Sequence, residues 1–130
     1  MNELTILTKD SSNFSALGFR DNIVSLLADY DYVMLFSEKE GLPITLIEGA
    51  MCYKPLIVND IGGCLEIGIP SENAFYAKDW DALKLILNTL EFVPSTEYER
   101  MALRSRQIYE DKFSYDMMLE KYVGLIQRFM

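Results

Sequence analysis

One stretch of the chain, residues 32–51, joins a strand-like run to a loop and a helix signature and constrains the fold more than any other. The run Tyr32–Phe36 is continuously apolar, which is typical of a strand buried inside a parallel sheet. Leu46, Ile47 and Ala50 have the spacing of a helix packed on a sheet, and Pro43 suits the first helical position, where no N–H is needed. We therefore predict a strand, a loop at its carboxyl end that can hold a ligand, and a helix that starts near Pro43.

The rest of the chain continues to alternate between strand and helix patterns. Further strands are predicted over residues 4–8, 56–59 and 75–76. This alternation is typical of an α/β domain with a parallel sheet and right-handed crossovers, and 130 residues suffice for one domain, residues 1–130. The residues expected to cap the helices are Asp21, Asp79, Thr96 with Glu99 in a capping box, and Ser114.

The last helix is predicted to use its large side chains for packing. Met118, Leu119, Tyr122 and Ile126 share one helical face. Residues of this kind at this spacing are more typical of a packed interior than of a cofactor site. We therefore expect them to be packing residues.

Two carboxylates, Glu40 and Glu48, bracket the loop and the start of the helix at residues 43–51. Gly41 has no Cβ, so a ligand can approach its backbone, and the helical N–H groups near Ile44 and Thr45 favour a phosphate. A carboxylate accepts two hydroxyl hydrogen bonds well, as a sugar diol offers them. The arrangement suits a nucleotide sugar, but it also fits a solvated loop residue and a surface helix residue, and both interpretations stay open.

Composition excludes several other functions. The chain has 12 Lys plus Arg against 20 Asp plus Glu, and this net charge of −8 argues against nucleic acid and anionic membranes as partners. It contains no histidine, which removes the commonest general base and the serine triad. We expect no metal site, no transmembrane segment and a cytoplasmic location, with Cys52 and Cys64 as free thiols.

The string from Ser37 to Met51 resembles the signature of retaining glycosyltransferase family 4, the glycosyl transferases group 1, whose members have the two-domain GT-B fold. Residues 54–67 are similar to the strand and double-glycine loop that follow this signature. Residues 16–23 resemble a short strand of the family and the helix that follows it. Residues 113–115 resemble the start of the family's C-terminal helix. The resemblance covers roughly residues 15–128 and implies the Rossmann-like, donor-binding half of a GT-B enzyme, with C-terminal helices.

The resemblance also implies a role for each residue of the site. Glu40 matches the catalytic residue that contacts the donor sugar, and Glu48 matches the residue that binds the ribose hydroxyls. The double glycine also fits a plain turn after Asp60, and that alternative stays open. No cofactor is implied, because the nucleoside-diphosphate sugar is a substrate. The other donor-binding residues implied are Ser37, Gly41, Leu42, Pro43, Ile44, Thr45, Gly62 and Gly63.

The sequence departs from the family pattern on its N-terminal side. The family has a Gly-Arg strand and a lysine that neutralise the donor diphosphate, and they would lie before Leu4. We therefore expect a domain that is incomplete at that side and binds a diphosphate poorly, because carboxylate–phosphate repulsion is not offset. A missing first strand would also expose a sheet edge, which invites self-association.

Three functional interpretations follow. The first is a donor-binding domain that transfers a hexose from a nucleoside-diphosphate sugar to a glycan or lipid acceptor, for example in surface-polysaccharide assembly, and is inactive alone. The second is a split enzyme whose partner chain supplies the acceptor domain, with membrane association of the full enzyme left open. The third is a non-enzymatic interaction module. A dinucleotide-binding enzyme is disfavoured, because no Gly-x-Gly-x-x-Gly follows a strand.

Overall fold

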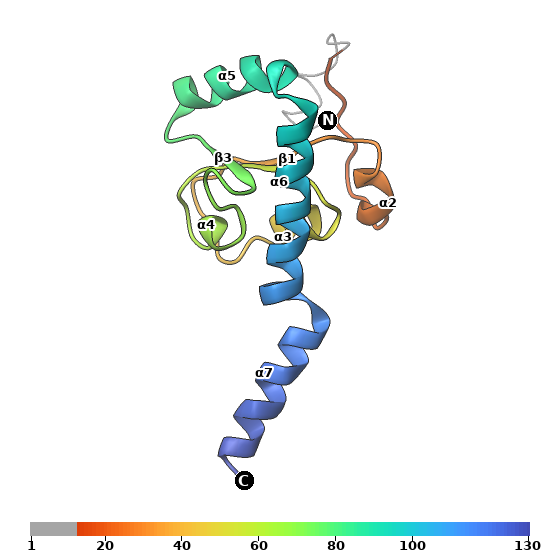
Figure 1. Ribbon diagram of the computed structural model, residues 1–130, viewed down its shortest axis with the longest axis vertical. Coiled ribbons are helices and arrows are strands. Elements are labelled where there is room, and N and C mark those ends of the chain that lie inside the picture. The colour runs from red at the N-terminus through yellow and green to blue at the C-terminus, as the bar shows by residue number, and fades with distance from the viewer. Residues whose placement is uncertain (1–12) are drawn as a thin grey trace.

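A parallel three-stranded sheet forms the centre of the computed structural model, which describes residues 13–130 (Figure 1). The strands are β1 (Val33–Leu35), β2 (Leu56–Val58) and β3 (Ala74–Tyr76), in the order β1-β2-β3. Their register aligns Leu35 with Val58 and Val58 with Tyr76. The predicted α/β class and parallel sheet are confirmed, whereas the strand predicted over residues 4–8 lies outside the described residues.

Helices cover both faces of the sheet. On one face, α3 and α4 pack against Leu56 and Val58, and on the other α5 packs against Ile57. All three side chains of β2 are buried, as expected for a central strand that is covered on both sides. The helical elements are α2 (Ile23–Leu27), α3 (Ile44–Met51), α4 (Cys64–Ile67), α5 (Trp80–Thr89), the 3-10 turn η1 (Leu90–Phe92), α6 (Ser95–Ile108), the π-helical turn η2 (Tyr109–Phe113) and α7 (Tyr115–Arg128).

Two buried polar side chains join α6 to the sheet layer. The Asn73 amide donates to the Ile67 carbonyl and to the Ser105 hydroxyl, each over 3.0 Å. Ser105 in turn donates to the Lys54 carbonyl over 2.8 Å. Each of these buried groups has a partner, so its hydrogen bonds offset the cost of removing it from water and the network attaches α6 to the sheet layer.

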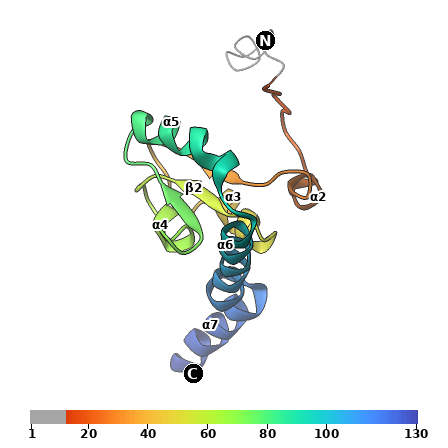
Figure 2. The same cartoon turned by 45° about the horizontal axis from the view of Figure 1, so that its top comes forward.

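The last helix, α7, leaves the body of the molecule, and the prediction that its apolar face is buried is wrong. Figures 1 and 2 show α7 continuing away from the sheet beyond the end of α6. No α7 residue is buried, and Tyr122 and Ile126 are 59% and 58% exposed. The spacing indicated an apolar face correctly, but within residues 13–130 nothing covers it. None of the helices in this part of the chain is long and apolar enough to cross a membrane.

Two of the four predicted caps are confirmed. Asp79 accepts a hydrogen bond from the Ala82 amide, and Ser114 accepts one from the Met117 amide. Asp21 is not a cap, because α2 starts one residue later, after Asn22. Thr96 lies inside α6, whose N-cap is Pro94, so the capping box is absent. Residues 16–19 also do not form the short strand that the resemblance implies.

Candidate functional site

The carboxyl ends of β1 and β2 are fixed to each other by one amide side chain. Asn59 follows β2, donates to the Ser37 carbonyl over 2.7 Å and accepts from the Ser37 amide over 3.2 Å. The Ser37 hydroxyl donates to the Lys39 carbonyl over 3.1 Å. Ser37 therefore shapes the start of the loop. Asn59 was not predicted as a site residue, although a polar residue directly after a buried strand was a usable signal.

The double glycine packs directly on the loop that carries Glu40. Gly62 has a φ of +53°, and a Cβ at this position would overlap the Glu40 carbonyl oxygen. The Gly63 amide donates to the Gly41 carbonyl over 2.7 Å, and a Cβ on Gly63 would lie 2.9 Å from Leu42 Cδ1. These glycines thus allow a close approach between two loops and do more than form a turn.

The start of α3 presents backbone amides beside these loops. Pro43 is the N-cap in an extended conformation, with φ −78° and ψ 108°, so the helix begins at Ile44, one residue later than predicted. The Pro43 carbonyl accepts from the Leu46 and Ile47 amides, which lie one turn into the helix. Ile44 and Thr45 come before the first residues whose amides make these helical bonds, and both residues are exposed. The positive end of the helix dipole favours an anion here.

The structure places the two glutamates in different surroundings. Glu48 is half-buried and lines a groove of about 480 Å³ together with residues 20–25 at the start of α2. Glu40 lies near Cys64: burial raises the pKa of the Cys64 thiol, and the Glu40 carboxylate raises it further. Glu48 thus lies in the groove beside α2, whereas the loop of Glu40 packs on the glycines that precede α4.

A guanidinium shares the groove with Glu48, and sequence reasoning assigned it no role. Arg20 lines this groove and donates to the Leu17 carbonyl over 3.2 Å. Asp21 and Glu48 also line the groove, so its formal charge is −1, from one positive and two negative side chains. Weak binding of a diphosphate stays a prediction. Within residues 13–130, no group of three or more side chains has the make-up of a metal site.

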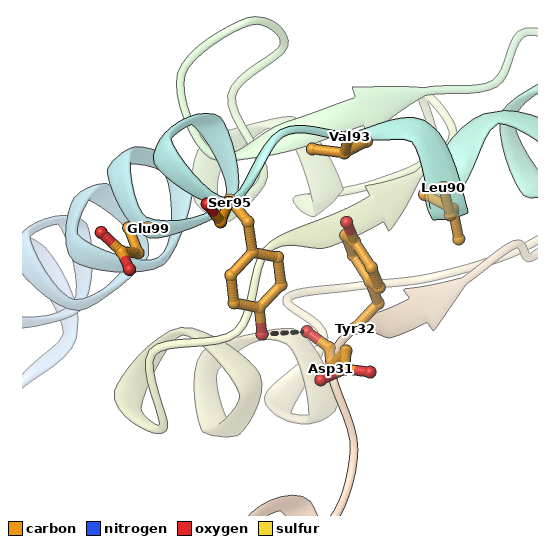
Figure 3. Close-up of a pocket in the computed structure, with 7 residues that line it drawn as sticks. Asp31, Tyr32, Leu90, Val93, Ser95 and Glu99 are labelled. Carbon is orange, nitrogen blue, oxygen red and sulfur yellow. Dashed lines mark hydrogen bonds between the residues drawn. The ribbon is translucent and has the colours of Figure 1, made fainter.

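A second cavity, of about 290 Å³, lies at the amino end of β1 and not at the predicted site (Figure 3). Tyr98 of α6 donates to the Asp31 carbonyl over 2.7 Å, and its ring meets that of Tyr32 edge-on, with centroids 5.5 Å apart. Burial raises the pKa of both tyrosines, and the nearby Asp31 carboxylate adds to this. The cluster joins α6 to the amino end of β1.

Comparison with known proteins agrees with this geometry. The profile of the family described as Glycosyl transferases group 1 matches residues 7–118. The chain is 31% identical over 114 residues to N,N'-diacetylbacillosaminyl-diphospho-undecaprenol alpha-1,3-N-acetylgalactosaminyltransferase of Campylobacter jejuni, a match that covers 86% of this chain and 30% of that protein. It is 27% identical over 107 residues to N-acetyl-alpha-D-glucosaminyl L-malate synthase of Bacillus anthracis, covering 82% of this chain and 28% of that protein.

A shorter match reaches a third glycosyltransferase. Over 39 residues, 30% of this chain and 12% of the other, the sequence is 41% identical to O-antigen biosynthesis glycosyltransferase WbnH of Escherichia coli. Each match thus covers less than a third of the length of the relative. Its parallel sheet with helices on both faces is consistent with one Rossmann-like half of a GT-B enzyme. The chain belongs to the glycosyl transferases group 1 family.

Proposed function

We propose that this chain is the donor-binding half of a retaining hexosyltransferase. It would take a hexose from a nucleoside-diphosphate sugar and pass it to a glycan or lipid-linked acceptor in surface-polysaccharide assembly. The names of two relatives support this, since one transfers N-acetylgalactosamine to a diphospho-undecaprenol-linked acceptor and another acts in O-antigen biosynthesis. The free thiols Cys52 and Cys64 suit a reducing compartment, and we place the reaction in the cytoplasm.

The packing of the double glycine on the Glu40 loop is the observation that carries the proposal. It brings two segments of the predicted site together at the carboxyl edge of the sheet, where open α/β sheets bind ligands. We assign Glu40 to the donor sugar, the amides of Ile44 and Thr45 to the diphosphate and Glu48 to the ribose hydroxyls. Residues 41–43 and 62–63 would line the space between them, and Ser37 would position the loop through its bond to Lys39.

A partner-dependent function is the second candidate, and one observation favours it. The apolar face of α7 is uncovered in the described residues, with Tyr115 66% exposed and Leu125 50% exposed. Exposed apolar surface of this extent is typical of an interaction site. On this second interpretation the chain is inactive alone, and a further domain or a partner chain supplies the acceptor site.

A titration of the full chain with UDP, GDP and ADP and their hexose conjugates tests the donor site. We expect saturable NMR amide shifts over residues 40–48 for one base. Glu48→Ala should weaken that binding by at least about tenfold, because it removes the acceptor of the ribose hydroxyls. The matched control is Glu91→Ala, which removes an exposed carboxylate from η1, away from the carboxyl edge, and should change nothing.

Two outcomes would contradict the donor-site proposal. The first is the absence of any shift at millimolar nucleotide, which would favour the partner-dependent candidate. The second is a large loss of stability in Glu48→Ala, which would make Glu48 a structural residue. We expect the free energy of unfolding of this variant to change by no more than about 0.5 kcal/mol, as for most surface substitutions.

A further inference from the structure

The single tryptophan of the chain has an exposed position that packing does not explain. Trp80 is the first residue of α5, and 66% of it is exposed. Its ring meets that of Phe36, with centroids 4.5 Å apart and planes inclined by 45°. The helix is anchored elsewhere, by Leu83, which is 4% exposed. Covering Phe36 alone would need only a small aliphatic side chain, so the large exposed ring is available for another contact.

The topology places this aromatic pair at the same edge of the sheet as the candidate donor site. Phe36 directly precedes Ser37, and the Ala77 amide donates to the Val58 carbonyl over 2.8 Å, so β3 ends level with its neighbours. Trp80 follows only three residues later. A ligand that reaches beyond the carboxyl ends of the strands can therefore touch both the Glu40 loop and Trp80.

The pair nevertheless lies on the other face of the sheet from the loops assigned to the donor. Phe36 packs in the cluster of Ile57 and Leu83, on the α5 face. Gly62 and Gly63 pack on the Glu40 loop and directly precede Cys64, which belongs to the opposite cluster, and Glu48 lines the groove beside α2. A sugar ring that stacks on Trp80 would therefore lie outside the loops assigned to the donor.

We propose that Trp80, backed by Phe36, is a stacking platform for a pyranose ring of the acceptor. The inference rests on the proposed transferase function. An indole offers a broad apolar face and one N–H donor, which match the C–H face of a sugar ring and one of its hydroxyl groups. Sites for small ligands combine such aromatic walls with a few polar groups, and an exposed tryptophan at a ligand edge supplies both.

The emission of Trp80 reports directly on this contact, because no other tryptophan is present. The full chain is titrated with the methyl α-glycosides of glucose, galactose, N-acetylglucosamine and N-acetylgalactosamine, with glycerol as the polyol control. We expect a saturable change in emission with at least one glycoside, half-complete in the millimolar range, and none with glycerol. Leu85→Ala removes another exposed apolar side chain of α5 and should leave the titration unchanged.

Variants separate this inference from the donor site. Trp80→Ala should weaken glycoside binding at least about tenfold, whereas Trp80→Phe should retain most of the binding affinity. Because Trp80→Ala has no tryptophan emission, binding is measured here from the NMR amide shifts of residues 78–82. The same Trp80→Ala chain should keep its nucleotide shifts at residues 40–48, and Glu48→Ala should keep the glycoside-induced change in emission.

Three results would contradict the proposal that Trp80 is a stacking platform for the acceptor. They are no saturable change with any of the glycosides, an equal change with glycerol, and unchanged amide shifts in Trp80→Ala. A change in emission that nucleotide alone produces and Glu48→Ala abolishes would assign Trp80 to the donor instead. Loss of the nucleotide shifts alone would refute the donor site and leave the stacking result standing.

Discussion

Two helices of equal length, α6 and α7, differ in what they bury. Each has 14 residues and an apolar stripe, yet α6 buries Met101, Ser105 and Ile108, and α7 buries none of its side chains. The more apolar of the two sequences is the one that stays exposed. Periodicity thus shows that a helix has an apolar face, but it does not show what that face packs against.

Polar contacts, in addition to its buried residues, attach α6 to the rest of the domain. Arg106 donates to the Met51 carbonyl over 2.7 Å and to Glu110 over 2.8 Å. Its guanidinium lies over the rings of Tyr53 and Tyr109, 5.4 Å and 5.2 Å from their centroids. Two of these partners, the Met51 carbonyl and the Tyr53 ring, lie at or just after the end of α3, so Arg106 attaches α6 to that part of the molecule.

The largest expected difference between the helices comes from matched isoleucines. Ile108 in α6 is 1% exposed, and Ile126 in α7 is 58% exposed. Ile108→Ala should lower the free energy of unfolding by about 2–5 kcal/mol, because it leaves a cavity, whereas Ile126→Ala should change it by no more than about 0.5 kcal/mol. Urea denaturation of both variants measures this, and equal losses would mean that α7 is packed in solution.

A smaller difference is expected between two serines. Ser105→Ala leaves the Lys54 carbonyl and one Asn73 amide hydrogen without a partner in the interior, which should cost about 1–3 kcal/mol of global stability. Ser114→Ala removes the cap of α7 and should cost about 1 kcal/mol, confined to that helix. Hydrogen exchange distinguishes the two, since only the first variant should speed exchange in β2. Faster exchange in β2 of Ser114→Ala would show that α7 is coupled to the core.

The smallest effect is expected when polar residues are placed on the α7 face. The double variant Leu119→Gln/Ile126→Gln changes two side chains that are about half exposed, so stability should stay within about 0.5 kcal/mol. Glu120→Gln, on the polar side of the same helix, is the control. A loss above about 1 kcal/mol by chemical denaturation would show that another surface covers α7 in solution.

Local signals in the sequence were sufficient for much of the fold. The runs around Val33 and Leu56 became parallel strands, because β2 is covered on both faces, and Asp79 and Ser114 cap their helices as predicted. Asp21 is not a cap because Asn22 occupies that position in α2, and Thr96 is not a cap because α6 begins before it, after the extended backbone of Pro94. The exposure of α7 could not be predicted, since it depends on what surrounds the helix and not on its own residues.

Some features of the candidate site could also be predicted from the sequence, and others could not. The loop after β1, the start of α3 and the place of Glu48 follow from residues close in sequence, so they were predictable. The packing of Gly62 on Glu40 joins two separate segments, and the sequence left a plain turn equally open. Asn59 had a usable signal in its position at the end of a strand, whereas the contact of Trp80 with Phe36, just after β1, joins segments far apart in the sequence.

The contact between the two glycines and the Glu40 loop has a consequence for substitutions at Glu40. It is made by main-chain atoms, with the Gly63 amide on the Gly41 carbonyl and Gly62 against the Glu40 carbonyl oxygen. The main-chain part of this contact therefore does not depend on the carboxylate of Glu40. A substitution at Glu40 would therefore change the chemistry of this edge of the sheet while leaving the main-chain contact that shapes the loop in place.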